Sequence, residues 1–223
     1  MINLYNQDCM EAMAKMKDKE FDLAIVDPPY GINAPNMNMA SMPSRGEIST
    51  ASRLRRLNGG GGKLKDRILN KSEIKWDYEK PPSEYFTEIV RVSINQIIFG
   101  GNYFDLRPTR CVICWDKIQP WNNFSQWEMV WTSFDSPASI FRCSNFDHGK
   151  IHPTQKPVVL YKWLLDNYAK PGDRILDTHL GSGSIAIACH DMGFDLEGYE
   201  IDKDYYDAAC ERLKRHQAQG RLF

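Results

Sequence analysis

The run Phe21-Asp22-Leu23-Ala24-Ile25-Val26 and the tetrapeptide Asp27-Pro28-Pro29-Tyr30 that closes it decide the fold of this chain. The apolar run predicts a buried strand, so the tetrapeptide lies at a strand's carboxyl end, where open α/β sheets bind their ligands. Neither proline has a backbone N–H, and the turn therefore offers carbonyl acceptors and few donors. Asp27 adds a carboxylate and Tyr30 a flat ring. These acceptors suit two N–H donors on a planar base, such as the exocyclic amine of adenine or cytosine.

Length and composition indicate one globular domain over residues 1–223. The chain carries a net charge of −1, with 42% hydrophobic and 26% charged residues, so no global basic field points to nucleic acid. No apolar run approaches the ~18 residues of a membrane span, and the N-terminus lacks the features of a signal peptide. We therefore expect a cytoplasmic protein that does not bind membranes, and six cysteines that are free thiols.

A metal site is not expected. Cys111 and Cys114 match the CxxC spacing, but they lie in a run that predicts a strand. Residues three apart on a strand face opposite sides of the sheet, so the two thiols would not easily share an ion.

Short apolar runs alternate with helical patterns, which predicts βαβ units and an α/β fold with a mostly parallel sheet. The aromatic run Glu128–Thr132 follows its neighbour closely and is expected to be one antiparallel strand at an edge of the sheet. The seven expected strands are Ile2–Tyr5, Leu23–Asp27, Gln96–Phe99, Cys111–Trp115, Glu128–Thr132, Arg174–Asp177 and Asp195–Glu200. The expected helices are Met10–Met16, Ser83–Ser93, Val158–Tyr168, Ser182–Met192 and Asp204–Gln217.

Residues 31–75 interrupt this pattern. The segment has no sustained periodicity, and it carries nine Lys and Arg against three acids, a local charge of +6. So long a loop in a compact domain is either functional or a linker. We interpret it as a basic, mobile insertion whose Arg53, Arg55 and Arg56 contact phosphates, with a solvated linker as the alternative.

A second ligand site is indicated near the C-terminus. The expected strand Arg174–Asp177 runs into a turn with Gly181 and Gly183, and Glu200 ends the next expected strand, seventeen residues past Gly183. In dinucleotide-binding folds an acid at about this offset binds ribose hydroxyls. The pattern favours an adenosine-type ligand, although a structural glycine turn would look similar.

The segment His152-Pro153-Thr154-Gln155-Lys156-Pro157 precedes this half of the chain. Its two prolines bracket a polar stretch and start a helix, which indicates a fixed turn. Thr154 and Lys156 could hydrogen-bond a ligand carboxylate near the helix N-terminus, whereas the simpler interpretation is that the segment only begins the helix.

Three motifs in this order, Asp27–Tyr30, His152–Pro157 and Asp177–Ser184, resemble those of the N4-cytosine/N6-adenine DNA methyltransferases in their permuted, β-like arrangement. The resemblance covers nearly the whole chain and implies a Rossmann-like, S-adenosylmethionine-dependent methyltransferase fold. There are two departures. Thr178-His179 stands where the family usually has Pro-Phe, and only about twenty residues separate Thr132 from His152, which leaves no room there for the usual target-recognition domain.

By this resemblance, S-adenosylmethionine donates a methyl group to the exocyclic amine of a base flipped out of DNA. The implied catalytic residues are Asp27, Pro28, Pro29 and Tyr30, with Tyr30 stacking on the base. The implied cofactor-binding residues are Asp8, Asp27, His152, Thr154, Lys156, Asp177, Leu180, Gly181, Ser182, Gly183, Ser184, Glu200 and Ile201. DNA contacts are expected from Arg53, Arg55, Arg56, Trp76, Asn102 and Tyr103.

Asp rather than Ser at position 27 favours adenine N6 as the target. N4-cytosine methylation, an RNA or free-nucleoside substrate, and a non-catalytic methyltransferase-like subunit that binds DNA remain open. A Rossmann-type dehydrogenase is disfavoured because only GxG is present, late in the chain. DNA is the expected partner, within a restriction–modification setting, and a homodimer is left open.

Overall fold

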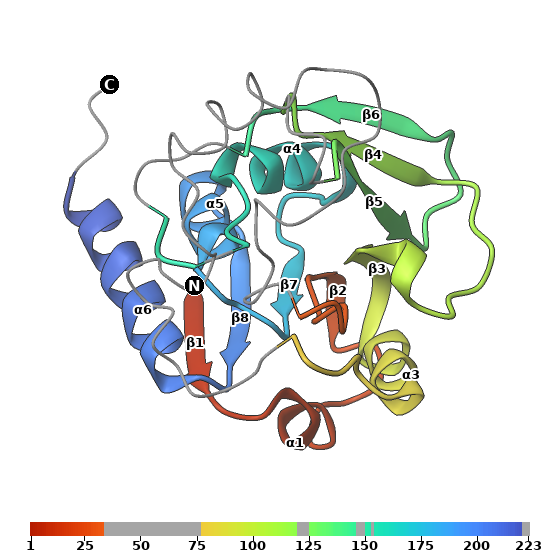
Figure 1. The fold of residues 1–223 in the computed structure, drawn as a ribbon. Coiled ribbons are helices and arrows are strands. Elements are labelled where there is room, and N and C mark those ends of the chain that lie inside the picture. The colour runs from red at the N-terminus through yellow and green to blue at the C-terminus, as the bar shows by residue number, and fades with distance from the viewer. Residues whose placement is uncertain (34–76, 120–124, 146–149, 153, 220–223) are drawn as a thin grey trace.

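An eight-stranded sheet forms the centre of the described part of the protein (Figure 1). In this computed structural model, residues 1–33, 77–119, 125–145, 150–152 and 154–219 are described. The strands follow the order β1-β8-β7-β2-β3-β5-β4-β6 across the sheet. Their bounds are β1 Ile2–Asn6, β2 Phe21–Val26, β3 Ser93–Phe99, β4 Val112–Asp116, β5 Trp127–Thr132, β6 Ser139–Arg142, β7 Arg174–Asp177 and β8 Asp195–Glu200.

Helices cover both faces of the sheet (Figure 1). One cluster of buried side chains joins the sheet to α4 (Val158–Tyr168), α5 (Ser184–Met192) and α6 (Lys203–Ala218). A second cluster joins the opposite face to α1 (Cys9–Met13) and α3 (Ser83–Val92). The expected helices are therefore all present, and the fold is a three-layer α/β/α arrangement.

Strand β2 explains why its sequence is apolar at nearly every position. Leu23 and Ile25 belong to the cluster beneath α4 and α5, whereas Ala24 and Val26 belong to the cluster beneath α1 and α3. Successive side chains of a strand point to opposite faces, so a strand covered on both sides is apolar throughout.

The position of β5 corrects the expectation of an antiparallel strand at the edge. Strand β5 is antiparallel to its neighbours, as expected, but it lies between β3 and β4. The edge is formed by an eighth, unexpected strand, β6, which pairs parallel to β4. Strand β6 has only four residues, alternating between half-buried and exposed, so no apolar run marks it in the sequence.

The topology gathers several loops at one edge of the sheet. Strands β1, β8, β7, β2 and β3 are mutually parallel, so the segments that follow them meet at their common carboxyl edge. Because β5 runs the other way, its first residues lie at that same edge: Val130 pairs with Phe99, the last residue of β3. The beginning of β5 is thereby placed beside the turn that follows β2.

Two findings concern only the described residue ranges. Within these ranges no group of three or more His, Cys, Asp or Glu side chains is arranged to hold a metal ion. No described helix is long and apolar enough to cross a membrane.

Asp202 is expected to anchor α6. Its carboxylate accepts hydrogen bonds from the backbone N–H groups of Asp204 (2.9 Å) and Tyr205 (3.2 Å) at the start of the helix. Asp202→Ala should lower the free energy of unfolding by about 1 kcal/mol, a typical loss for an N-cap. Asp204→Ala, an exposed position in the same turn, is the control. Equal urea midpoints for the two variants would contradict a capping role.

Candidate active site

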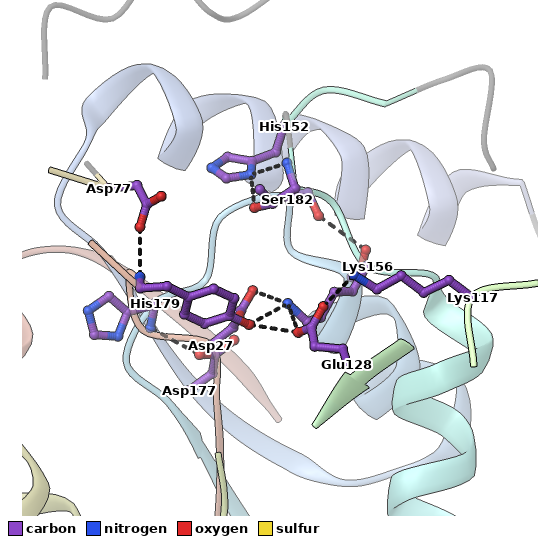
Figure 2. Close-up of polar contacts among 12 residues, drawn as sticks. Asp27, Asp77, Lys117, Glu128, His152, Lys156, Asp177, His179 and Ser182 are labelled. Carbon is purple, nitrogen blue, oxygen red and sulfur yellow. Dashed lines mark hydrogen bonds and ion pairs between the residues drawn. The ribbon is translucent and has the colours of Figure 1, made fainter. Parts of the chain in front are cut away.

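Asp27 lies directly after β2 and contacts two other polar side chains (Figure 2). The Lys156 Nζ contacts Asp27 Oδ2 in a short ion pair. The hydroxyl of Tyr30 lies 2.7 Å from Asp27 Oδ1 and 2.6 Å from Glu128 Oε1. The Tyr30 hydroxyl thus bridges the two carboxylates. It has one proton and can donate it to only one of them at a time.

Glu128 completes the cluster from β5. Its Oε1 lies 3.2 Å from the Lys156 Nζ, and its Oε2 lies 2.8 Å from the Lys117 Nζ. The side chains of Lys156 and Glu128 are only 4% and 9% exposed, whereas that of Asp27 is 19% exposed. We call Asp27, Tyr30, Glu128, Lys156 and Lys117 the acid–lysine cluster; it pairs two carboxylates with two ammonium groups.

The charges of the acid–lysine cluster shift the pKa values of its members. Burial alone would raise the pKa of Glu128, but the charges of Lys156 and Lys117 bring it to about 2. Burial would lower the pKa of Lys156, whereas Asp27 and Glu128 raise it above its ordinary value. Burial raises the pKa of Asp27, an effect that Lys156 opposes and the Glu128 charge reinforces. Lys156 is therefore a charged donor that faces two acceptors.

The ring of Tyr30 is held between backbone and aromatic neighbours. It stacks on Tyr103 with 4.8 Å between ring centroids. The carboxylate of Asp77 accepts hydrogen bonds from the backbone N–H groups of Tyr30 (2.6 Å) and Gly31 (2.9 Å). Gly100 has a φ of +68°, and a Cβ atom there would collide with the Tyr30 ring. Glycine is therefore required at position 100 on both counts.

The second predicted ligand site forms at the neighbouring strand ends. Gly181 (φ +51°) and Gly183 (φ +69°) make the turn from β7 into α5. The carboxylate of Glu200, at the end of β8, accepts hydrogen bonds from the backbone N–H groups of Gly181 (2.8 Å) and Asp202 (2.9 Å). Because β7 pairs with both β8 and β2, this glycine turn lies next to the turn that contains Asp27.

Asp177 fits a positively charged ligand group. It is 2% exposed, and the one hydrogen bond to its carboxylate that we find among the described residues comes from the backbone N–H of His179, at 3.0 Å. Burial raises its pKa to about 8, an effect that the nearby Asp27 and Glu200 charges reinforce. At pH 7 this carboxyl is therefore mostly protonated, and an ammonium ion beside it, such as the amino group of S-adenosylmethionine, would favour its ionised form.

Thr178 and His179, which stand where the resembled family usually has Pro-Phe, form a polar network with Tyr85. The Thr178 hydroxyl lies 2.6 Å from the hydroxyl of Tyr85 and 3.0 Å from His179 Nδ1. The His179 ring also packs edge-on against Tyr85 at 5.3 Å. Burial lowers the pKa of His179 to about 4, so the imidazole is neutral at pH 7. The chain thus keeps an aromatic group at this position and adds hydrogen bonds to α3.

The segment from His152 to Lys156 leads into α4. Lys156 is buried against Asp27 and Glu128, and its contact with a ligand carboxylate stays a prediction. Thr154 donates from its backbone N–H to His152 Nδ1 at 3.3 Å. The His152 ring lies over the glycine turn, 3.8 Å from where a Cβ of Gly181 would stand. Burial and the Lys156 charge lower the pKa of His152 to about 3.

The remaining expected site residues vary in exposure and in partners. Asp8 caps α1, accepting from the backbone N–H of Met10 at 2.7 Å. Asn102 and Ile201 are exposed, and Leu180 is buried. The Ser182 and Ser184 hydroxyls lie 3.1 Å apart. Arg53, Arg55, Arg56 and Trp76 lie outside the described residues.

Sequence reasoning missed three residues of the site: Glu128, Lys117 and Asp77. The sequence pattern indicates a strand at Glu128 and no other role for it. The available signal was a single acid in the interior of an aromatic strand, Trp127–Thr132, because charged residues are rarely buried without a partner.

Known proteins similar to this chain are DNA methyltransferases. A family model described as DNA methylase, of the N6/N4 methyltransferases, matches residues 108–211. The type II methyltransferase M2.DpnII of Streptococcus pneumoniae is 25% identical over 248 residues, covering 95% of this chain and 89% of that protein. The type II methyltransferase M.HpaI of Haemophilus parainfluenzae is 39% identical over 82 residues, which are 35% of this chain and 26% of that protein.

A solved structure confirms the fold. The M1.HpyAVI–SAM complex superimposes with a TM-score of 0.55 at 17% identity, covering 96% of this chain and 99% of that one. The α/β fold with a mostly parallel sheet is therefore that of DNA methyltransferases. The family match over residues 108–211 and the similarity to M2.DpnII over nearly the full length support the resemblance to the N4-cytosine/N6-adenine DNA methyltransferase family.

Proposed function

We propose that this chain transfers a methyl group from S-adenosylmethionine to the N6 amine of an adenine flipped out of DNA. The observation that carries the proposal is the adjacency of two sites at one edge of the sheet. The acceptor-rich turn with Asp27 follows β2, and the glycine turn with its two acids follows the neighbouring β7 and β8. A methyl donor in one site would face a target base in the other.

The acceptors of the Asp27 turn supply the chemistry that an exocyclic amine needs. Its lone pair is delocalised into the ring, which makes it a poor nucleophile. The Asp27 carboxylate and the Pro28 carbonyl would accept hydrogen bonds from its two N–H groups and draw the nitrogen towards tetrahedral geometry. Asp27 would also be placed to take the proton that the methylated nitrogen must lose. Fixed orientation of the two reactants would contribute much of the acceleration.

Residues around the glycine turn would hold the cofactor. When bound, S-adenosylmethionine supplies an electrophilic methyl group. Asp177 would pair with its ammonium group, because the carboxylate is buried with few described donors. Glu200 would accept from the ribose hydroxyls with lone pairs not used by Gly181 and Asp202. A similar structure, M1.HpyAVI, was solved with SAM, which supports S-adenosylmethionine as the cofactor.

Adenine is proposed over cytosine because an Asp opens the tetrapeptide. Mass spectrometry of nucleosides from DNA treated with the protein would decide between the two, by showing N6-methyladenine or N4-methylcytosine.

A second candidate function is favoured by one observation. The Asp27 oxygens are already in contact with Lys156 and Tyr30, which is what a methyltransferase-like subunit without activity would show. Methyl transfer by the purified protein would exclude this alternative.

Asp27→Ala should reduce methyl transfer by roughly 100-fold or more, the usual effect of removing a group that acts in the transition state. Its affinity for S-adenosylmethionine should change little, because Asp27 is assigned to the target amine. Asp27→Asn should be milder, since the amide oxygen still accepts. A tritiated-methyl assay and calorimetry measure the two properties. Wild-type activity in Asp27→Ala would remove the tetrapeptide from catalysis.

Glu200→Ala should weaken binding of S-adenosylmethionine by about 1–3 kcal/mol, through loss of hydrogen bonds to a charged group. Glu197→Ala is the matched control: it lies on the same strand, but Glu197 bonds Arg174 instead, at 3.1 Å. Calorimetry with S-adenosylmethionine should show weaker binding for Glu200→Ala only. Equal affinities for both variants would place the ribose elsewhere.

DNA phosphates are proposed to contact the basic segment at Arg53, Arg55 and Arg56. Replacing the three with Ala should make the dependence of log Kd on log salt shallower by about 2 to 3, because each phosphate that a side chain neutralises adds about 0.9 to this slope. A control variant replaces the exposed Lys170, Lys214 and Arg215 with Ala, so it has the same net charge as the first triple variant. If both triple variants have the same salt slope, the basic segment does not bind the backbone.

A further inference from the structure

The acid–lysine cluster poses a problem for the proposed function. To activate an amine, the Asp27 carboxylate must be free to accept hydrogen bonds. In the structure the Lys156 ammonium contacts its Oδ2, and the Tyr30 hydroxyl lies 2.7 Å from its Oδ1. An incoming amine must therefore compete with a buried cation for the same oxygens.

Glu128 offers the ammonium a second acceptor. Its Oε1 is already 3.2 Å from the Lys156 Nζ, so a small movement of the flexible lysine would strengthen this contact and release Asp27. The cluster's second ammonium, of Lys117, holds the other oxygen of Glu128 at 2.8 Å, which fixes the carboxylate in place. Figure 2 shows Lys156 between Asp27 and Glu128, with Lys117 beyond Glu128.

Movement of the Lys156 ammonium from Asp27 to Glu128 would leave the charge balance of the site unchanged. Two carboxylates and two ammonium groups are present before and after the lysine moves, and no charge enters or leaves the protein interior. The target amine would bring N–H donors to Asp27 as the ammonium withdraws. Each buried polar group would thus keep a partner throughout, which matters because an unpartnered buried charge is costly.

We propose that Lys156 is a positioning residue that covers the Asp27 carboxylate until the target amine arrives, and that Glu128 then receives the ammonium. This inference rests on the proposed methyl transfer. It assigns Lys156 to the target side of the site instead of the cofactor side, and it gives a role to Glu128. Lys156 and Glu128 act through Asp27, and neither needs to touch the base.

Removing Lys156 and removing Glu128 should shift the pKa of Asp27 in opposite directions. Lys156 opposes the rise in the Asp27 pKa that burial causes, and Glu128 adds to that rise. Lys156→Met should therefore raise the Asp27 pKa, and Glu128→Gln should lower it, each by about one unit or more. The charged and titratable groups that face or influence Asp27 are Lys156, Glu128, Tyr30, Asp177, Tyr85 and Tyr161.

The pH dependence of kcat/KM should report these changes. Methyl transfer requires ionised Asp27, so activity is lost as the pH falls through the pKa of that carboxyl. The acidic limb should move to higher pH in Lys156→Met and to lower pH in Glu128→Gln. Glu197→Gln makes the same change of charge on β8, where Glu197 contacts Arg174, and should leave the limb in place.

The plateau of kcat/KM above the acidic limb distinguishes movement of the Lys156 ammonium to Glu128 from a purely electrostatic effect of Glu128 on Asp27. Above the acidic limb Asp27 is ionised in every variant, so a purely electrostatic Glu128 would leave the plateau of Glu128→Gln unchanged. If Glu128 receives the ammonium, this variant keeps Lys156 on Asp27, and its plateau kcat/KM should fall about tenfold or more. An unchanged plateau in a folded Glu128→Gln protein would overturn the proposal.

A measurement independent of activity completes the test. Carbon NMR of protein labelled at the aspartate carboxyl carbons gives the Asp27 titration directly, with Asp27→Asn assigning the signal. Titration midpoints that move in the same direction, or do not move, in the two variants would overturn the proposal. If Lys156→Met does not fold, Glu128→Gln must still lower the midpoint. Inactive wild-type protein would refute the proposed function, while this titration would still test the coupling between the residues.

Discussion

Two carboxylates compete for one buried ammonium, and the arrangement of the site depends on that competition. Asp27 and Glu128 approach each other because Lys156 stands between them and the Tyr30 hydroxyl bridges them. Without the cation, two like charges would be held close together in a poorly solvated place. The ion pairs therefore link β2, β5 and the segment before α4, and the tyrosine ring is oriented by the same contacts.

The parallel strands explain why this cluster lies beside the glycine turn proposed to bind the cofactor. Five neighbouring strands end at one edge, so the turns after β2, β7 and β8 become adjacent although the sequence separates them widely. The antiparallel β5 adds a residue from the beginning of a strand to the same edge. A fully parallel sheet would place Glu128 at the opposite end, away from Asp27. Reversal of this single strand is thus a structural requirement of the cluster.

The sequence predicted those parts of the protein that are encoded locally. Strand β2, the glycine turn after β7 and the helix α4 follow from apolar runs, glycines and prolines close to one another in the chain, and the positions of Asp27 and Glu200 at strand ends follow with them. The pairing of Lys156 with Asp27, 129 residues away, depends on the order of the strands and has no local signal. The partners of Glu128 depend on the same order of strands, although an acid within an aromatic strand is a local signal for the residue itself. Strand β6 was not predicted because only its pairing with β4 defines it.

The wide spacing of Asp27, Glu128 and Lys156 also has a consequence for synthesis of the protein on the ribosome. A nascent chain that has emerged only as far as β5 contains both acids and Lys117, but it lacks Lys156, the ammonium that contacts both acids. Strand β7, which pairs with β2, is made later still. Contacts at such long separation slow folding, because a long loop must close before the contact forms. The acid–lysine cluster therefore cannot be completed before the segment that carries Lys156 is made, and a chain truncated before it would not form the cluster.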